Sequence, residues 1–364
     1  MDRTLLRREK LARRLKADSA DAFLVVSATN VRYLTGFTGE DATLVLTKGR
    51  SVIVSDGRFT TQLEQECPGL EAHIRPIGQV MPEAVSVVVK ALAVRNLAFE
   101  SAVLCVADFE DLRGRLPSVE MVGLTDRVET LRAVKDREEV VAIREAVGYA
   151  ERAFSMLRSG LREGDSEKDV ADALESYLRR CGASAASFPP IVAVGERSAL
   201  PHARPTQEAR IGDADFVLCD WGATGRPYKS DLTRALVTGK VTPKFEKIYR
   251  TVLAAQERGI AAIRPGALAG DVDAEARSVI EEAGFGRFFR HGLGHGLGMD
   301  IHESPRLRKG ANSPLLEGMV VTVEPGIYLP GWGGVRIEDD VLVTPDGCEV
   351  LTQVAKSLDS VRLR

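Results

Sequence analysis

The segment HGLGHGLGMDIHE, residues 291–303, holds three of the five histidines of this chain and four of its 33 glycines. A helix here would place two of the histidines on one face, but each glycine inside it would cost about 1 kcal/mol relative to alanine. Alternating glycines instead favour an extended segment against which a ligand or another backbone packs closely. Position 297 is leucine, so the segment is not a dinucleotide-binding fingerprint. Imidazoles beside such bare backbone predict a metal or proton-transfer site whose other groups come from elsewhere in the chain.

The composition is that of an ordinary globular protein with room for two domains. The chain has 364 residues, of which 44% are hydrophobic and 28% charged, and its net charge is −3. This charge gives no reason to expect nucleic acid or an anionic membrane as a partner, and no apolar run approaches the roughly 20 residues of a membrane span. The five cysteines contain no C-x-x-C pair, which favours reduced thiols and a cytoplasmic protein. Residues 1–22 are rich in arginine but include acidic residues, so we expect an amphipathic first helix rather than a targeting segment.

The first third of the chain alternates between strand and helix patterns. We expect strands in DAFLVV (21–26), SVIVSDG (51–57), NLAFE (96–100) and AVLCVA (102–107), and a helix in ADFEDLRGRL (107–116). This pattern predicts a compact α/β domain that ends near residue 126. It carries no evident chemistry, since its histidine, His73, stands alone.

The remainder of the chain has longer helical patterns between strands. Apolar residues at helical spacing predict a first helix, namely Val140, Ile143, Val147, Ala150, Phe154 and Leu157. Ser166 and Asp169 form a capping-box pattern that starts a second helix, and two more helices are expected at about 242–263 and 270–284. Strands are expected in IVAV (191–194), FVLCD (216–220), TRALVTG (233–239), VVTVEPGIY (320–328) and GVRIEDDVLV (334–343). These elements predict an α+β domain over 135–364, joined to the first by a linker at 127–134.

Two of the expected strands resemble each other. FVLCDWG (216–222) and VVTVEPG (320–326) each read as an apolar strand, a carboxylate, a bulky or stiff residue and glycine. The echo is consistent with a pseudo-twofold fold whose halves meet at one site, and equally with coincidence between two ordinary strands.

Four carboxylates lie within or beside apolar strand patterns, where acidic residues are depleted. They are Asp220, Asp231, Glu324 and Glu338. A capped turn or an arginine partner would explain any one of them alone, and Arg234 and Arg336 are close in sequence to Asp231 and Glu338. Four together with a glycine-flanked histidine favour a bound cation, because buried unpaired carboxylates are unstable without one.

This donor set indicates the kind of metal site. Oxygen-rich sites with one imidazole suit Mn²⁺, Co²⁺ or Zn²⁺. Four carboxylates and a histidine offer more donors than one small ion needs, so we expect two ions about 3.5 Å apart with a shared hydroxide, an arrangement typical of hydrolases. Cys219 points to the opposite face of its strand from Asp220 and is expected in the core.

The motifs resemble those of a known family. DWGATGRPYKSDLTR (220–234), HGLGHGLGMDIHE, VEPGIY (323–328) and GVRIEDD (334–340) look like the four signature segments of the pita-bread metallopeptidases, in the branch holding prolidase and Xaa-Pro aminopeptidase. NVRYLTGFTG, SDGRF and ETLRAVKDREEVVAIREA resemble the amino-terminal domain, the interdomain linker and the first catalytic helix of the same proteins. The resemblance implies an α+β protein with a small creatinase-like α/β domain, 1–126, followed by a pita-bread catalytic domain, 135–364.

The resemblance also implies the metal ligands. Asp220 would bind one ion, Asp231 and Glu338 would bridge both, and His295 and Glu324 would complete the second. Glu324 would also assist proton transfer from the attacking water.

Further residues match catalytic and supporting positions of the family. His302 would hydrogen-bond the scissile carbonyl as it becomes an oxyanion, His202 would lie near the proline ring, and His291 would help move protons. Arg336 and Tyr328 match supporting positions behind the ligands. The glycines of the histidine segment would leave room for substrate backbone.

The resulting expectation is a homodimeric, dinuclear peptidase, with Mn²⁺ as the favoured metal. It would cleave small peptides between an amino-terminal residue and a penultimate proline, as an Xaa-Pro aminopeptidase or, as a close variant, an Xaa-Pro dipeptidase. We favour the aminopeptidase type, with residues 1–126 limiting access to the cleft. The alternatives are a catalytically silent binding module on the same fold and a hydrolase of a non-peptide C–N bond. One departure from the family pattern, Arg226-Pro227 before a tyrosine, leaves the shape of the loop between two ligands open.

Overall fold

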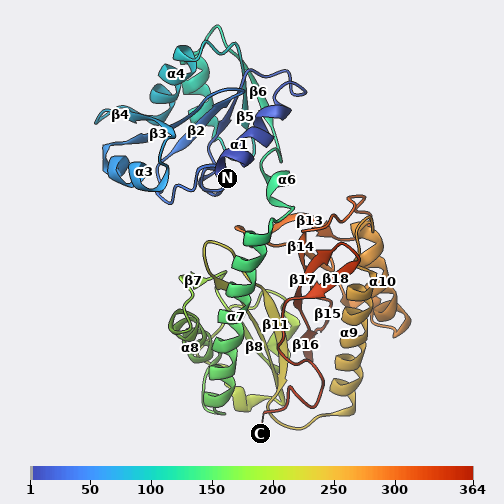
Figure 1. The fold of residues 1–364 in the computed structure, drawn as a ribbon. Helices are drawn as coiled ribbons and strands as arrows, with labels where there is room; N and C mark the ends of the chain where they lie inside the picture. The colour runs from blue at the N-terminus through green and yellow to red at the C-terminus, as the bar shows by residue number, and fades with distance from the viewer. Residues whose placement is uncertain (1–2, 364) are drawn as a thin grey trace. The chain divides into compact units, whose positions relative to one another are not determined.

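The computed structural model describes residues 3–363, which form two compact units that divide between Arg132 and Ala133 (Figure 1). This division lies within the segment 127–134, for which the sequence predicts a linker. Among the described residues, no helix is both long and apolar enough to cross a membrane.

The amino-terminal unit is built on a mixed six-stranded sheet in the order β4-β3-β2-β1-β5-β6. Its strands are β1 (Ala22–Val25), β2 (Thr43–Thr47), β3 (Ser51–Asp56), β4 (Glu71–Arg75), β5 (Asn96–Glu100) and β6 (Glu120–Leu124). Its helices are α1 (Arg3–Arg14), α2 (Ala28–Thr35), α3 (Thr60–Glu66), α4 (Met81–Ala91), α5 (Val106–Arg115) and α6 (Glu129–Arg132). The central strand β1 runs antiparallel to β2 and parallel to β5, and apolar side chains of the sheet pack against α4 and α5 in one core.

One strand predicted for this unit is wrong. The segment AVLCVA, 102–107, forms no strand, because the chain turns directly after β5 with Val103 N–H donating to Glu100 O at 3.1 Å. Cys105 then caps α5, its Sγ accepting from the Asp108 amide at 3.4 Å. The apolar residues of this segment therefore belong to a turn and to the start of a helix. The helix predicted at 107–116 is confirmed as α5.

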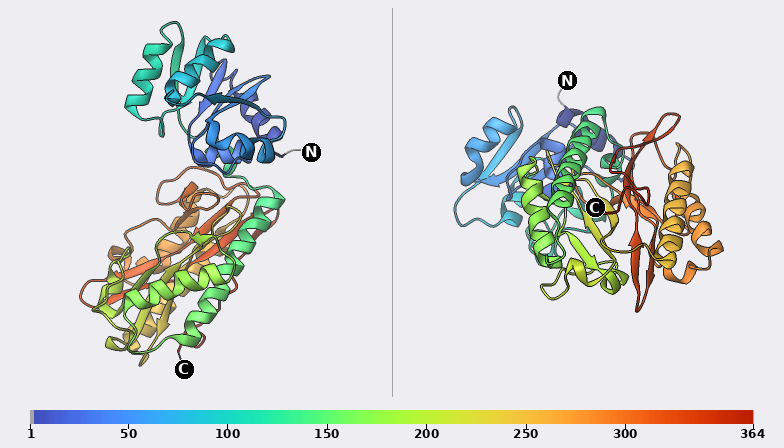
Figure 2. Two further views of the ribbon diagram at one scale, coloured as in Figure 1. Left: turned by 90° about the vertical axis from the view of Figure 1, so that its left-hand side faces the viewer. Right: turned by 90° about the horizontal axis from the view of Figure 1, so that it is seen from below.

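The carboxy-terminal unit consists of two halves, each with a helix pair and an antiparallel sheet. The first half contains α7 (Arg137–Gly160), α8 (Glu167–Arg180), β7 (Ala185–Ala186), β8 (Ile191–Val194), β9 (Phe216–Trp221), β10 (Ala223–Thr224) and β11 (Leu232–Val237). The second half contains α9 (Pro243–Ala262), α10 (Ala269–Glu282), β12 (Gly294–Gly296), β13 (Glu303–Leu307), β14 (Val320–Val323), β15 (Gly326–Leu329), β16 (Gly333–Arg336), β17 (Asp339–Thr344) and β18 (Gly347–Val350). Figure 2 shows the strands between the two helix pairs, and one apolar core joins both halves. This α+β arrangement confirms the predicted fold class.

Local sequence signals explain where the helices of this unit begin. Asp136 caps α7 in a capping box with Glu139, and Ser166 caps α8 in a second one with Asp169, as its sequence pattern predicts. The stripe of apolar residues predicted for α7 lies inward, with Ile143 through Leu157 of that stripe buried against the strands. The same packing orients β9, because the Trp221 ring stacks on Phe154 with centroids 4.2 Å apart.

The two similar strands of the sequence occupy equivalent places. β9 lies between β8 and β11, and β14 lies between β12 and β17. Asp220 lies inside β9 and Glu324 follows β14 directly, so each half contributes a carboxylate from its central strand.

Candidate metal centre

A cavity of about 510 Å³ in the carboxy-terminal unit collects the residues that the sequence singled out. Every sequence-predicted site residue lines it: Asp220, Asp231, His295, Glu324, Glu338, His202, His291, His302, Arg336 and Tyr328. Apolar side chains complete the wall, among them Phe188, Pro190 and Ile301. Elements of both halves of the unit therefore supply one site.

Strand ends, rather than strand interiors, present most of the carboxylates. Asp220 lies within β9, whereas Asp231 precedes β11, Glu324 follows β14 and Glu338 lies between β16 and β17. The single strand predicted over residues 334–343 is thus two strands separated by Ile337 and Glu338. At this break between the strands, the Glu338 amide donates to Thr233 O on β11 at 3.2 Å.

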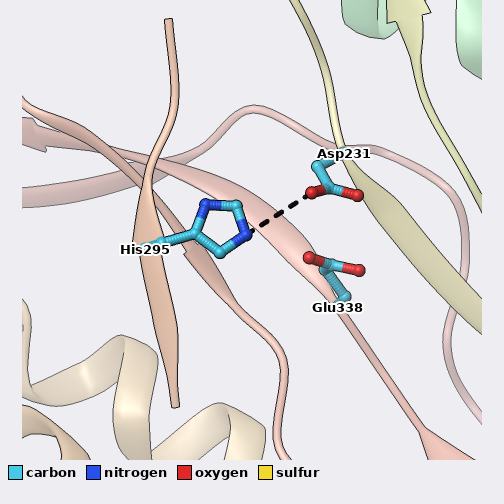
Figure 3. A group of neighbouring side chains, drawn as sticks. All are labelled: Asp231, His295 and Glu338. Atoms are coloured by element: carbon cyan, nitrogen blue, oxygen red, sulfur yellow. Dashed lines mark ion pairs between the residues drawn. The ribbon is translucent and has the colours of Figure 1, made fainter. Parts of the chain in front are cut away.

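The densest donor group consists of Asp231, His295 and Glu338, whose ligand atoms lie within 4.8 Å of one another (Figure 3). Nε2 of His295 is 3.6 Å from Asp231 Oδ2 and 3.4 Å from Glu324 Oε1. The other ring nitrogen, Nδ1, lies 3.1 Å from Gly296 O, which can only accept, so Nδ1 carries the proton. Nε2 therefore directs a lone pair at carboxylate oxygens, an arrangement that a cation between them stabilises.

Burial and repulsion between like charges shift the pKa of each of these groups so that its neutral form is favoured. Burial and neighbouring carboxylates raise the pKa of Asp231 and of Glu338 well above its ordinary value, and burial raises the pKa of Glu324 to about 8. Burial lowers the pKa of His295 to about 3. A bound divalent ion would favour the charged forms of these carboxylates, because it would place positive charge directly against their oxygens.

Asp220 has one oxygen in a short hydrogen bond and one oxygen without a partner among the described residues. Its Oδ2 accepts from Arg336 Nη2 at 2.6 Å, while its buried Oδ1 has no hydrogen-bond partner among the described residues. Burial raises the pKa of Asp220 although the arginine opposes that effect. An orphaned carboxylate oxygen beside three further carboxylates and an imidazole fits a second divalent ion.

Arg336 and Thr233 hold the donors in place from behind. Arg336 Nε donates to Thr233 Oγ1 at 3.0 Å, and the Thr233 hydroxyl donates to Glu338 Oε2 at 2.6 Å. Sequence reasoning missed Thr233, although its place two residues after Asp231 on the same strand face was a usable signal.

Neither arginine that lies near a ligand in sequence pairs with that ligand. Arg336, on β16, pairs with Asp220 on β9 instead of with Glu338, and Arg234 pairs with Asp339 at 2.7 Å instead of with Asp231. The simple explanation of an adjacent arginine partner is therefore wrong for both carboxylates.

Tyr328 links Arg336 to His291 in a directed chain. His291 Nδ1 lies 2.7 Å from the acceptor Gly292 O and therefore carries the proton, so Nε2 accepts from Tyr328 OH at 3.0 Å. The tyrosine oxygen in turn accepts from Arg336 Nη1 at 2.8 Å. Burial lowers the pKa of His291 to about 4, in keeping with a neutral ring.

The remaining histidines lie at the open side of the ligand group. The His302 ring meets the His295 ring edge to face, with centroids 4.5 Å apart, and burial lowers the pKa of His302. His202 lies on the loop after residues 195–199 and lines the same cavity.

The alternating glycines allow the neighbouring strands to approach closely. A Cβ at Gly294 would lie 2.0 Å from Thr322 O, and one at Gly296 would lie 2.1 Å from Ser304 O. The expected close approach exists, but at these positions the approaching backbone belongs to β14 and to β13 rather than to a substrate. His295 is thus held on a strand that is wedged between two others.

The unusual Arg226-Pro227 loop lies away from these groups. Arg226 is exposed and pairs with Glu145 on α7 at 2.8 Å, and neither Arg226 nor Pro227 is among the residues that line the cavity. The following Tyr228 donates from its hydroxyl to Glu139 Oε1 at 2.6 Å.

Comparisons with known proteins match both units. Residues 141–345 match metallopeptidase family M24, and residues 7–134 match the creatinase/prolidase N-terminal domain. An Xaa-Pro dipeptidase from Pyrococcus horikoshii is 34% identical, covering 96% of this chain and 97% of that protein. Among solved structures, an Xaa-Pro dipeptidase from Bacillus anthracis superimposes with a TM-score of 0.94 at 36% identity, covering 99% of this chain and 100% of that one. An X-Pro aminopeptidase from Thermotoga maritima gives a TM-score of 0.87 at 34% identity, covering 95% and 99%.

Proposed function

The chain belongs to metallopeptidase family M24, and from this premise we propose that it is an Xaa-Pro dipeptidase. It would hydrolyse the bond between an amino-terminal residue and proline. The observation that carries the proposal is one cavity in which four carboxylates and an unprotonated imidazole nitrogen converge beside His302 and His202. A catalytically silent binding module would be expected to have lost some of these donors, and a hydrolase of a non-peptide C–N bond gains no support from relatives named for peptide substrates.

Two divalent ions, with Mn²⁺ favoured, would be held by five side chains: Asp220, Asp231, His295, Glu324 and Glu338. When bound, such ions supply a hydroxide nucleophile near neutral pH and polarise the scissile carbonyl. The protein's own groups do the rest. Glu324, which lines the cavity, would hold and release the proton of the attacking water at a carboxylate oxygen.

The histidines would act on the substrate. His302, at the open side of His295, donates to the scissile oxygen as negative charge develops there. His202, on the facing loop with Phe188 and Pro190, would contact the proline ring. His291 would help to move protons, and its contact with Tyr328 would keep that ring neutral and oriented.

Arg306 supports a dipeptidase rather than the aminopeptidase favoured by the sequence. It pairs directly with His295 across β12 and β13, so both side chains lie on the cavity side. Cross-strand partners have Cβ atoms about 5 Å apart, which leaves the guanidinium within reach of a carboxylate one residue beyond the scissile bond. That carboxylate is the free end of an Xaa-Pro dipeptide.

Assembly and location are further parts of the proposal. We expect a homodimer whose amino-terminal units limit access to the cavity, which light scattering and removal of residues 1–126 would test. No disulfide joins any of the five cysteines within the described residues, which supports a reducing compartment such as the cytoplasm.

Hydrolysis of matched peptides tests the activity. We expect chelated protein to be inactive and Mn²⁺ to restore cleavage of Ala-Pro, with little action on Ala-Ala. Zn²⁺ and Co²⁺ in parallel would identify the preferred ion. Full activity of protein from which all metal has been removed would contradict the proposal, as would equal rates on Ala-Pro and Ala-Ala.

A further inference from the structure

Two arginines lie in a row on the cavity side of β13. Along this strand Glu303, Pro305 and Leu307 are buried, whereas the alternate residues are exposed. Arg306 and the residue directly after the strand, Arg308, both line the cavity. Arg204, on the loop that also carries His202, lines it as well.

These three guanidinium groups have no anionic partner in the part of the chain that the structure describes. Among residues 3–363, no hydrogen bond or ion pair holds the side chain of Arg204, Arg306 or Arg308. Apart from the four carboxylates of the metal group, no acidic side chain of the described chain lines the cavity. This contrasts with Arg234 and Arg277, which pair with carboxylates. Unpaired cations that face a substrate cavity are suited to bind an anion there.

The two strand arginines stand at different depths. Arg306 is level with the metal group because its partner across the sheet is His295. Arg308 lies two residues farther, which on a strand is about 7 Å. Gly292 allows this part of the chain to pack closely, since a Cβ there would lie 3.0 Å from the Arg308 Cβ.

A step of about 7 Å also equals two residues of an extended peptide. We propose, on the basis of the proposed Xaa-Pro activity, that Arg308 with Arg204 forms a second carboxylate site for peptides one or two residues longer than Xaa-Pro. Arg306 takes the carboxylate of dipeptides, and Arg308 takes that of Xaa-Pro-Xaa and Xaa-Pro-Xaa-Xaa. The protein therefore recognises a free peptide carboxylate at more than one length.

Binding of fragments that would occupy the leaving side of the cavity tests this without turnover. We compare proline, Pro-Gly and prolylglycinamide by calorimetry on protein loaded with Mn²⁺. Arg308→Gln is expected to raise the Kd of Pro-Gly about tenfold and to change that of proline by less than twofold, because a charge-assisted hydrogen bond is lost only for the longer ligand. Prolylglycinamide should bind the wild type about tenfold more weakly than Pro-Gly does. In Arg308→Gln, prolylglycinamide and Pro-Gly should have equal Kd values. Arg308→Lys should restore part of the affinity, since the charge remains.

Lys309→Gln is the matched control. Lys309 is the adjacent exposed cation and is not among the residues that line the cavity, so this change alters net charge equally without touching the proposed site. It should leave all three Kd values within twofold.

Kinetics separate this inference from the proposed function. Arg308→Gln should lower kcat/KM for Ala-Pro-Gly about tenfold through KM and leave Ala-Pro unchanged. If metal-loaded wild type cleaves neither peptide, the proposed function is wrong, and the binding series still decides the role of Arg308. The inference is overturned if Arg308→Gln leaves the Kd of Pro-Gly unchanged, weakens proline equally, or is matched by Lys309→Gln.

Discussion

Each unit contains a cluster of acidic side chains, and the two clusters differ in how many of their carboxylates pair with arginine. In the amino-terminal unit, Asp41 and Asp56 share Arg58 and Arg75, with nitrogen to oxygen distances of 2.7–3.0 Å. In the carboxy-terminal unit, four carboxylates line one cavity, and Arg336, which pairs with Asp220, is the arginine at hydrogen-bond distance from them.

The pKa shifts follow this difference in cation supply. The Arg58 guanidinium beside Asp56 lowers the pKa of that carboxyl, whereas burial and neighbouring carboxylates raise the pKa of Asp231. Clustering of acids is therefore not by itself a sign of a metal site. The sign is a surplus of buried carboxylates over the cations that the chain places in direct contact with them.

Removing one carboxylate from each cluster tests this difference most directly. Asp231→Asn should lower kcat/KM by more than about 10³-fold, because losing a ligand removes several kcal/mol of transition-state stabilisation. Metal content, measured by elemental analysis, should fall in the same variant. Asp41→Asn should retain metal and activity within twofold. Similar losses in both variants would show that the two clusters are not different in kind.

His302 tests whether residues beside the ligand group act on substrate rather than on metal. His302→Ala should lower kcat about 10²–10³-fold, the usual effect of removing a donor to developing oxyanion charge. Elemental analysis should still find the full metal content. Loss of metal would make His302 a ligand, and an effect below tenfold would assign it to packing.

Thr233 tests the support behind the carboxylates. Thr233→Val keeps the shape but removes the hydroxyl between Arg336 Nε and Glu338 Oε2. We expect kcat/KM to fall about tenfold, in line with about 1–2 kcal/mol for a buried hydrogen bond to a charged group. Thr233→Ser should restore most of the activity. If kcat/KM of Thr233→Val is unchanged, Glu338 does not need the hydrogen bond from the Thr233 hydroxyl.

Metal-induced thermal stabilisation should have a defined pH dependence. Because burial raises the pKa of Glu324 to about 8, protons compete with metal below that pH. The rise in Tm on adding Mn²⁺ should therefore be larger at pH 8.5 than at pH 6. At a concentration about 100 times Kd the stabilisation is about 2.7 kcal/mol. Asp56→Asn in the paired cluster should not change this pattern, and a larger rise at pH 6 would contradict it.

The parts of the molecule that could be predicted from sequence depend on neighbours along the chain. The capping box at Ser166 needed only residues three positions apart, so the start of α8 could be read directly. The glycine-flanked His295 and the four carboxylates stood out because those residue types are unusual in strands. All of them line one cavity.

What could not be predicted depends on strand register and on tertiary contacts. Arg336 pairs with Asp220, 116 positions away in the chain, and not with the nearby Glu338. The Thr233 hydroxyl can donate to Glu338 only because the fold brings β11 beside that carboxylate. The segment 102–107 has strand-like composition, but a turn after β5 and the cap formed by Cys105 decided its structure.

The wedged strand β12 also sets limits for protein engineering. Any side chain at Gly294 or Gly296 would collide with a carbonyl oxygen of an adjacent strand, at 2.0 Å and 2.1 Å from its Cβ. Libraries that vary this strand would therefore yield mostly unfolded clones, even though it carries the residue nearest to the chemistry. Residues 188–190 and 201–205 lie outside the strands and line the same cavity, so diversity aimed at a new substrate range belongs there.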